Sequence, residues 1–434
     1  MTTLIKNAVI ITMDDEKPVI KGDIGITDDI IAFVGKSKDF TPERTINANG
    51  NIVMPGLVNS HTHSPMTLLR CYADDLNLQD WLFNKIMPVE DTFTQEDIYW
   101  GSLLGCWEMI SGGITAFADM YFLNKKTAQA AVESGMRANI CRALQCFDET
   151  TANFEKDERM REALELYNMY NGAGEGRITV EMSAHAVYTN TPEYLMFVAQ
   201  TTDRLGAGMH VHISETRREN EECIKKYGMT PTALFKSCGF FNTRTNAAHC
   251  VYLSDEDINI FKEYKISIAN NPTSNLKLAS GIAPTGRYIR EGINVALGTD
   301  GAASNNNLNM FEEIHLAALL QKGVNENPEE VTAYEALKMA STNGAKALGI
   351  EKCGILKKGC RADLIIIDTD KPHLTPYYNP VSAVAYSAQA ADVDSVMVAG
   401  KFLMEKREVK TLDTEKIKHY AKKKGGAINA ACGC

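Results

Sequence analysis

The 434-residue sequence lacks the features of a membrane protein or a secreted protein. None of its apolar runs approaches the roughly 18 residues that are needed to cross a bilayer. Its first residues, Met-Thr-Thr-Leu-Ile-Lys, do not show the basic segment followed by an apolar stretch that marks a secretory signal. We therefore expect a cytoplasmic protein without a membrane partner.

Basic blocks are also missing from the sequence. The formal net charge is −10, and a short cationic patch at 422–424 reads as a solvated helix face. Binding to nucleic acid or to an anionic membrane surface requires positive charge concentrated on one face. We therefore expect no nucleic-acid partner.

The cysteines do not form a disulfide framework. There are 11 of them, an odd number, and they are scattered along the chain, which fits reduced thiols in a cytosolic enzyme. We assign no function to Cys432 and Cys434 at the end of the chain. The apolar fraction of 44% and the charged fraction of 23% are those of a globular protein, and we find no internal repeat or low-complexity linker.

Short apolar segments alternate with helical stretches through the middle of the chain. The expected strands cover residues 52–59, 114–119, 138–143, 178–183, 209–214, 246–251, 266–269 and 295–298. Thr94, Thr191 and Ser254 are N-cap residues at the expected starts of three helices. Eight strands alternating with helices predict an α/β fold, a (β/α)8 TIM-like barrel.

The two ends of the chain have a different pattern. Short strands with polar turns fill residues 2–51, and short strands return after about residue 350. We expect segments 1–54 and 349–434 to form one small discontinuous β-sandwich domain. The barrel of residues 55–348 would then be inserted between its two halves.

Two histidines stand at the end of the first expected barrel strand. His61 and His63 are separated by one residue, so in a strand their side chains point to the same face. The ends of other expected strands add Arg142, His185, His212, Glu215, His249 and Asp300. Active sites of these barrels lie where the C-terminal strand ends converge, so we expect these side chains to share one site.

Three imidazoles and a carboxylate suit a divalent metal ion. We expect His61, His63, His212 and Asp300 to hold it, with zinc favoured and iron or manganese possible because ligand type alone does not select the metal. A catalytic zinc lowers the pKa of its bound water to roughly 7. Asp300 is placed to take a proton from that water.

Two assignments around the fifth expected strand stay open on spacing alone. His210 and His212 share a strand face, and we favour His212 as the ligand because Glu215 follows it by three residues. Glu215 is the candidate general acid/base, and the alternative is that it caps the helix expected at 216–223. His249, on the next strand, is a candidate to polarise the attacking water.

Four segments carry these residues: Pro-Gly-Leu-Val-Asn-Ser-His-Thr-His at 55–63, His-Val-His-Ile-Ser-Glu-Thr at 210–216, Ala-Ala-His-Cys-Val at 247–251 and Leu-Gly-Thr-Asp-Gly at 297–301. Together they resemble the amidohydrolase superfamily, and specifically its 5-methylthioadenosine/S-adenosylhomocysteine deaminase branch. The resemblance extends over nearly the whole chain, including the flanking β segments.

The resemblance implies roles for individual residues. The metal ligands of the family fall on His61, His63, His212 and Asp300, and its proton-handling groups fall on Glu215, His249 and Asp300. Its substrate contacts fall on Glu90, Arg142 and His185, together with Glu215 and Asp300. In this branch Glu90 would accept hydrogen bonds from the ribose hydroxyls, and Arg142 would pair with a carboxylate.

The implied reaction is hydrolytic deamination of the adenine ring of 5'-modified adenosines by a metal-activated water. The region 149–154 lacks the second arginine that the family often supplies, which shifts the expectation towards 5'-methylthioadenosine, 5'-deoxyadenosine or adenosine. The fourth expected strand contains no lysine to bridge two metals, so one ion is expected. Enzymes of this type are commonly homo-oligomers.

Two alternatives remain. One is a guanine deaminase or a triazine-type hydrolase on the same scaffold, although a free base offers no ribose or carboxylate to Glu90 and Arg142. The other is a non-catalytic barrel that serves as a binding module. A barrel of that kind is expected to lack metal ligands, whereas this sequence contains every expected one.

Overall fold

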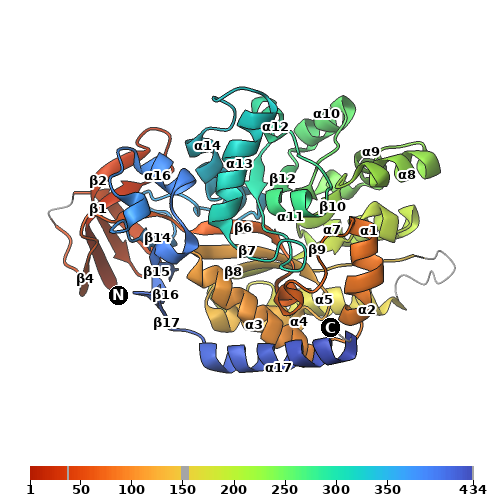
Figure 1. Ribbon diagram of the computed structural model, residues 1–434, viewed down its shortest axis with the longest axis horizontal. Helices are drawn as coiled ribbons and strands as arrows, with labels where there is room; N and C mark the ends of the chain where they lie inside the picture. Colours follow the sequence, from red (N-terminus) through yellow and green to blue (C-terminus); the bar gives the residue numbers. More distant parts are fainter. Residues whose placement is uncertain (37–38, 148–155, 433–434) are drawn as a thin grey trace.

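The computed structural model describes residues 1–36, 39–147 and 156–432. It contains an eight-stranded parallel sheet that curls into a nearly closed barrel and a nine-stranded mixed sheet at one end of the molecule (Figure 1). The barrel strands pair in chain order: β6 (Leu57–Thr62), β7 (Ile114–Tyr121), β8 (Arg137–Arg142), β9 (Ile178–Ala184), β10 (Met209–Ile213), β11 (Thr245–His249), β12 (Ser267–Asn270) and β13 (Val295–Leu297).

The predicted barrel is confirmed, and its strands lie within a few residues of the expected ones. The first strand needs a correction, because the segment predicted at 52–59 is two strands. β5 (Ile52–Pro55) belongs to the flanking sheet and β6 belongs to the barrel. Gly56 separates them, and a Cβ there would lie 2.1 Å from the Thr115 side chain, so the crossing requires a residue without a side chain.

The barrel closes between β13 and β6 without a regular ladder. Asn59 of β6 donates to Thr299 Oγ1 at 2.7 Å and accepts from the Thr299 N–H at 3.0 Å. The Asp300 N–H donates to the His61 carbonyl at 2.9 Å. A Cβ on Gly298 would lie 2.8 Å from the His61 nitrogen, so glycine permits this close approach. The seam therefore brings Asp300 beside His61.

The flanking sheet unites the two ends of the chain, as predicted. Its strands are β1 (Thr2–Ile11), β2 (Val19–Thr27), β3 (Ile30–Gly35), β4 (Arg44–Asn47), β5, β14 (Leu364–Ile367), β15 (Val393–Val398), β16 (Lys401–Glu405) and β17 (Glu408–Val409). N-terminal β5 and C-terminal β14 pair antiparallel at the centre of this sheet. Ile10, Val53 and Leu364 contribute to its own apolar core. The domain boundaries that the sequence predicts, between residues 54 and 55 and between residues 348 and 349, stay predictions.

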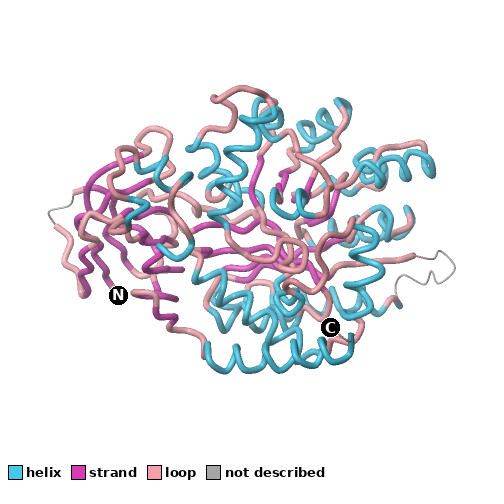
Figure 2. The backbone as a smooth tube through the Cα atoms, in the orientation of Figure 1, coloured by secondary structure: helices cyan, strands magenta, loops and turns pink. Residues whose placement is uncertain are grey.

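Helices surround the barrel strands (Figure 2). They are α1 (Leu78–Trp81), α2 (Met87–Glu90), α3 (Gln95–Ser111), α4 (Lys125–Ser134), α5 (Glu158–Tyr170), α6 (Ala173–Gly176), α7 (Pro192–Leu205), α8 (Arg217–Tyr227), α9 (Pro231–Ser237), α10 (Asp255–Tyr264), α11 (Pro272–Lys277), α12 (Thr285–Arg290), α13 (Met310–Val324), α14 (Ala333–Met339), α15 (Thr342–Ala347), α16 (Pro380–Tyr386) and α17 (Thr414–Cys432). Thr94, Thr191 and Ser254 cap α3, α7 and α10 through their side chains, as predicted.

A buried ion pair joins the barrel to the flanking sheet. Arg137 at the start of β8 donates to both carboxylate oxygens of Asp363, at 2.5 and 3.1 Å, and Asp363 also accepts from the Ala399 N–H.

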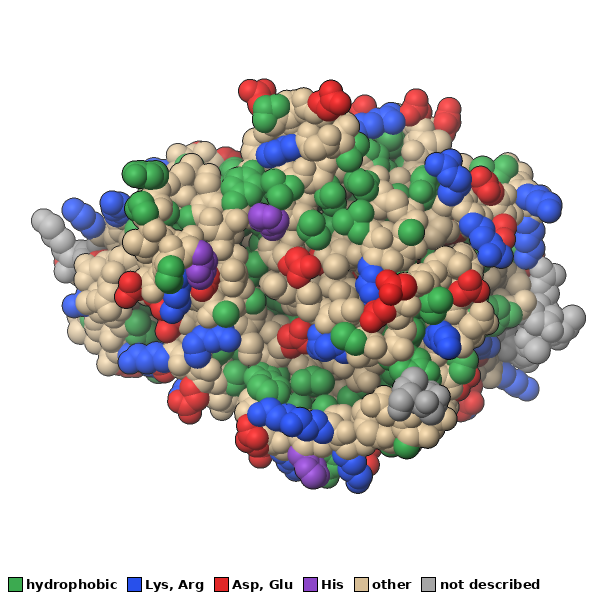
Figure 3. Space-filling model, viewed as in Figure 1, with side chains coloured by type: hydrophobic (Ala, Val, Ile, Leu, Met, Phe, Trp, Pro, Cys, Tyr) green, Lys and Arg blue, Asp and Glu red, His purple; other side chains and the backbone are tan. Residues whose placement is uncertain are grey.

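Acidic and basic side chains are interspersed over the face of the molecule that Figure 3 shows. Within the described ranges, no helix combines the length and apolar character that crossing a membrane requires.

Candidate active site

A cavity of about 380 Å³ lies at the C-terminal ends of the barrel strands. Eight of the nine predicted site residues line it: His63, Glu90, Arg142, His185, His212, Glu215, His249 and Asp300. The ninth, His61, is fully buried and contacts Asp300. A volume of this size suits a small organic ligand such as a nucleoside.

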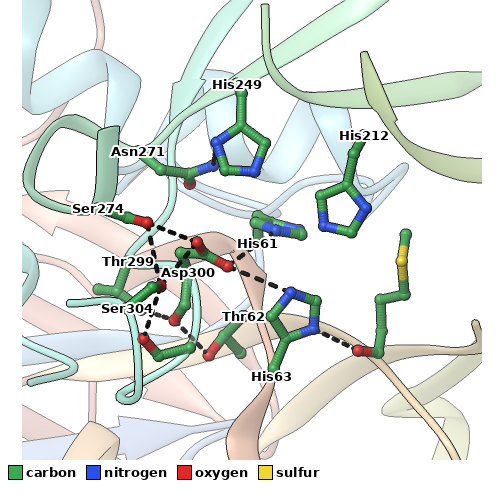
Figure 4. Close-up of polar contacts among 12 residues, drawn as sticks. His61, Thr62, His63, His212, His249, Asn271, Ser274, Thr299, Asp300 and Ser304 are labelled. Carbon is green, nitrogen blue, oxygen red and sulfur yellow. Dashed lines mark hydrogen bonds and ion pairs between the residues drawn. The ribbon is translucent and has the colours of Figure 1, made fainter. Parts of the chain in front are cut away.

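The predicted metal ligands converge on one point (Figure 4). His61 lies at the end of β6 and His63 directly follows it, His212 comes from β10, and Asp300 follows β13. The Nε2 atoms of His61 and His63 each lie 3.2 Å from Asp300 Oδ1. Ligand atoms of His61, His63 and His212 lie within 4.8 Å of one another, and so do those of His61, His249 and Asp300.

Hydrogen bonds to the outer ring nitrogens orient these imidazoles. His63 Nδ1 bonds the Met120 carbonyl, and His212 Nδ1 bonds the His185 carbonyl at 2.7 Å. A carbonyl can only accept, so each Nδ1 carries the proton and each Nε2 presents a lone pair when the ring is neutral. Histidines that bind metals are oriented in this way by backbone carbonyls.

The structure separates His210 from His212. His210 Nε2 lies 2.9 Å from His61 Nδ1, and His210 is not among the residues that line the cavity. Side chains that point into a barrel stack in layers, so two residues on one strand face lie at different depths. His212 occupies the layer at the cavity, and His210 lies in the layer that supports His61.

Burial keeps most of these imidazoles neutral. It lowers the pKa of His61 to about 4 and the pKa of His212 well below its ordinary value. Burial also opposes protonation of His63, but the hydrogen bond and the charge of Asp300 outweigh it and raise the pKa of His63 to about 9. A histidine ligand must be neutral to bind a metal, so a divalent ion at this position would replace the proton on His63.

The donor set passes a direct test for a divalent metal ion. His61 Nε2 is buried and has no hydrogen-bond partner among the described residues, although Asp300 lies beside it. A buried polar nitrogen without a partner is unfavourable unless something else binds it. Neutral imidazoles together with a carboxylate are ligands that zinc and related ions prefer.

Two serines hold the second carboxylate oxygen of Asp300. Ser274 and Ser304 donate to Oδ2 at 2.6 and 2.8 Å, and their hydroxyls lie 3.0 Å apart. Asp300 itself has a positive φ of 60°, and its carbonyl accepts from Thr62. These contacts direct Oδ1 towards His61. No local sequence pattern indicates these two serines, because Ser274 lies on α11 and Ser304 lies in the loop that follows β13.

Glu215 extends into the cavity instead of capping a helix. Thr216 caps α8, and the buried Glu219 carboxylate accepts the Glu215 N–H at 2.7 Å. The Glu215 side chain accepts from Ser280 at 3.3 Å and lies 3.8 Å from His249 Nε2. Burial raises the pKa of Glu215 above its ordinary value. A raised pKa favours the protonated form of the carboxyl group, which is the form that a general acid requires.

His249 faces Glu215 from the neighbouring strand. It has a positive φ of 71°, and its Nδ1 lies 2.8 Å from Asn275 Oδ1 and 3.3 Å from Asn271 Nδ2. The contact with the Asn275 oxygen is the shorter of the two and favours the tautomer with the proton on Nδ1. His249 Nε2 is thereby directed towards Glu215. Figure 4 shows the His249 ring next to the metal-ligand cluster.

Glu90, the last residue of α2, is buried in the cavity wall beside Tyr121 of β7. The Tyr121 hydroxyl donates to Glu90 Oε1, and burial raises the pKa of Glu90 to about 7 despite that bond. His185 follows β9 and contacts Thr189 Oγ1 at 3.2 Å, and burial lowers its pKa to about 3. Tyr121 was not predicted, because nothing in the sequence relates it to Glu90.

Arg142 has a partner that the sequence did not reveal. Its Nε donates to Glu162 Oε2 at 2.8 Å, and Glu162 also lines the cavity from α5. The region 149–154, which lacks the second arginine of the family, lies outside the described residues, as do Gly433 and Cys434. Arg142 is therefore a paired cation in this structure.

The chain matches known proteins over almost its full length. It is 49% identical to a 5-methylthioadenosine/S-adenosylhomocysteine deaminase of Acetivibrio thermocellus, over 97% of this chain and 98% of that one. It is also 45% identical to a 5'-deoxyadenosine deaminase of Methanosarcina acetivorans, over 95% of both chains.

A solved structure has the same fold. An adenosine deaminase from Xanthomonas campestris with bound zinc superposes with a TM-score of 0.93 at 33% identity, covering 99% of this chain and 98% of that one. A family model for amidohydrolases matches residues 52–403. This chain belongs to the amidohydrolase family.

Proposed function

We propose that this protein hydrolytically deaminates the adenine ring of 5'-modified adenosines, giving the inosine analogue and ammonia. The proposed substrates are 5'-methylthioadenosine, S-adenosylhomocysteine, 5'-deoxyadenosine and adenosine. The observation that carries the proposal is that one cavity holds both a metal-ligand cluster with a protonatable Glu215 and, on its wall, the buried carboxylate of Glu90. Relatives with deaminase names support the same reading.

We further propose that His61, His63, His212 and Asp300 hold one divalent ion, with zinc favoured. The zinc in the similar solved structure supports this choice of metal. β9 contains no lysine that could bridge a second ion, which supports a single site. Such an ion, when bound, lowers the pKa of a water molecule to roughly 7 and so supplies a nucleophile at neutral pH.

The side chains around the proposed ion divide the proton transfers. Asp300 Oδ1 takes a proton from the attacking water, while Ser274 and Ser304 keep its Oδ2 in place. Glu215 donates a proton to the ring nitrogen next to the reacting carbon, because its raised pKa keeps a proton available. Asp300 then passes its proton to the leaving amino group as the carbon–nitrogen bond breaks and ammonia departs, and Glu215 regains a proton from the new hydroxyl group as that group becomes the carbonyl. His249 Nε2 stabilises the charge that develops between them.

Other residues that line the cavity bind the ribose and the purine of the nucleoside. Glu90 accepts hydrogen bonds from the ribose hydroxyls, with Tyr121 holding its other side. Neutral His185 meets the far edge of the purine. A guanine or triazine substrate offers no ribose to Glu90, so this residue favours a nucleoside over the alternative substrates. The cytoplasmic location and the homo-oligomeric state stay predictions from the sequence.

The first test is a substrate panel for the metal-loaded protein, with ammonia release as the measurement. We expect turnover of 5'-methylthioadenosine, 5'-deoxyadenosine, adenosine and S-adenosylhomocysteine, and none of guanine or a chlorotriazine. The physical reason is that only the nucleosides reach both the catalytic cluster and Glu90. Turnover of guanine alone, or of the triazine alone, would contradict the proposal.

A second test uses pH and the ribose hydroxyls. The pKa of Glu90 is raised to about 7, so its carboxylate is lost as the pH falls through that value. The carboxylate accepts hydrogen bonds from both hydroxyls more strongly than the neutral acid does, so kcat/KM for adenosine relative to 2',3'-dideoxyadenosine should fall below about pH 7.

In the Glu90→Gln variant this ratio should be about tenfold lower at pH 8 and nearly independent of pH, since a hydrogen bond to a charged group contributes roughly 1.5–3 kcal/mol. The dideoxy substrate is the internal control for pH effects on the catalytic cluster. A ratio that changes equally with pH in both proteins would exclude Glu90 as the ribose acceptor.

A further inference from the structure

The ion pair between Arg142 and Glu162 lies at one end of the cavity. Arg142 ends β8, and Glu162 lies on α5, twenty positions further along the chain. The Arg142 side chain is 14% exposed and the Glu162 side chain is 28% exposed, so the pair is largely shielded from solvent. Both residues also line a smaller neighbouring cavity of about 70 Å³. The ion pair therefore lies between the main cavity and the smaller one and lines both.

Each member of the pair keeps unused hydrogen-bonding capacity. Arg142 uses Nε on Glu162 and Nη1 on the Ala143 carbonyl. Its Nη2 and the Oε1 of Glu162 have no hydrogen-bond partner among the residues that the structure describes. A donor on a cation and an acceptor on an anion thus remain available on adjacent groups.

The pairing changes what this end of the cavity can bind. A lone arginine would attract any anion, but here Glu162 neutralises Arg142 and would repel a carboxylate that approached without a compensating positive charge. A cation by itself would meet the same opposition from Arg142. A group that carries both charges on neighbouring atoms satisfies both members.

We infer that Arg142 and Glu162 form a zwitterion subsite, in which Arg142 binds the carboxylate and Glu162 binds the α-ammonium of an amino acid attached at the 5' end of the nucleoside. This inference rests on the proposed function and adds Glu162 as a residue that determines specificity. It assigns the charged substrate, S-adenosylhomocysteine, to a pair of opposite charges instead of to two arginines.

Three nucleosides separate the two charges of such a tail. S-Adenosylhomocysteine carries both charges, a 5'-(3-carboxypropylthio) analogue carries only the carboxylate, and a 5'-(3-aminopropylthio) analogue carries only the ammonium. In each protein, kcat/KM for these substrates is divided by kcat/KM for 5'-deoxyadenosine, which has no tail. The ratio removes any effect of a substitution on the chemistry at the ring.

The wild-type protein should prefer S-adenosylhomocysteine to either single-charge analogue by about tenfold or more. Glu162→Gln keeps an oxygen that can accept from Arg142 but removes the negative charge. In this variant the ratio for S-adenosylhomocysteine should fall about tenfold, while the ratio for the carboxylate analogue should rise. In Arg142→Gln the ratio for S-adenosylhomocysteine should also fall, while the ratio for the aminopropyl analogue should rise.

Glu165→Gln is a matched control on the same helix. Glu165 is bonded to Lys125 and does not line the main cavity, so its replacement should leave all three ratios unchanged. If Glu162 only positions Arg142, Glu162→Gln will change the ratios for the two carboxylate-bearing substrates in parallel, which overturns the inference. Unchanged ratios, or wild-type turnover of 5'-deoxyadenosine with none of S-adenosylhomocysteine, overturn it as well. A protein that deaminates no adenosine overturns the proposed function instead.

Discussion

Replacing Glu215 by glutamine is expected to lower kcat for every adenosine substrate by about 10²–10⁴-fold, the range that a single general acid or base contributes. The amide keeps the shape of the side chain and can still accept from Ser280. It cannot release a proton to the ring nitrogen. The effect should appear in kcat more than in KM, because the proton is needed only as the transition state forms.

The metal content should survive this change. Glu215 is 3.8 Å from His249 and belongs to neither group of side chains that could together hold a metal ion. Metal analysis of the purified variant should therefore give the wild-type amount. Glu222→Gln is the control on the adjacent helix, since Glu222 is exposed and pairs only with Arg218 among the described residues. Undiminished turnover in Glu215→Gln would remove Glu215 from the mechanism.

Asp300→Asn should reduce turnover even further, by more than about 10³-fold, and should also reduce the bound metal. Asp300 Oδ1 is the negative atom that faces both His61 and His63. Asparagine lacks this charge, so it binds a cation less tightly and cannot take the proton of the attacking water. The loss therefore combines weaker metal binding with a missing proton acceptor.

Thermal unfolding measures the effect of Asp300→Asn on metal binding independently of its effect on turnover. A ligand at about a thousand times its dissociation constant stabilises the folded state by about 4 kcal/mol, so added zinc should raise the Tm of the wild-type protein and raise it much less in Asp300→Asn. Asp255→Asn removes a surface carboxylate that pairs with Arg287 and should respond to zinc as the wild type does. An equal response of Asp300→Asn would show that Asp300 is not a ligand.

The fold was accessible from the sequence because its signals are local. The strands were located by runs of apolar residues, and three helix starts were located by cap residues whose side chains bond the N–H groups just ahead of them. The split between β5 and β6 was missed, because pairing with β14 in one sheet and with β7 in the other is not visible in the local apolar pattern.

The candidate site was accessible for a related reason. In a barrel, polar residues at the ends of the strands all lie on the shared C-terminal face, so strand ends predicted seven of the cavity's lining residues and His61, whereas Glu90 on α2 came only from the family resemblance. The sequence does not show at which layer of the barrel interior a side chain on a strand lies. His210 and His212 therefore stayed alternatives until the structure placed His210 behind His61.

The sequence by itself determined the barrel, the discontinuous flanking sheet and the side chains that meet at the strand ends, because apolar periodicity and the alternation of strands with helices can be recognised in short segments. Only the tertiary structure decided which charges already have partners. Glu162 next to Arg142, Tyr121 next to Glu90, and Ser274 and Ser304 on Asp300 each join residues from different elements. Such contacts depend on how the barrel closes and how its helices pack, and no local pattern records them.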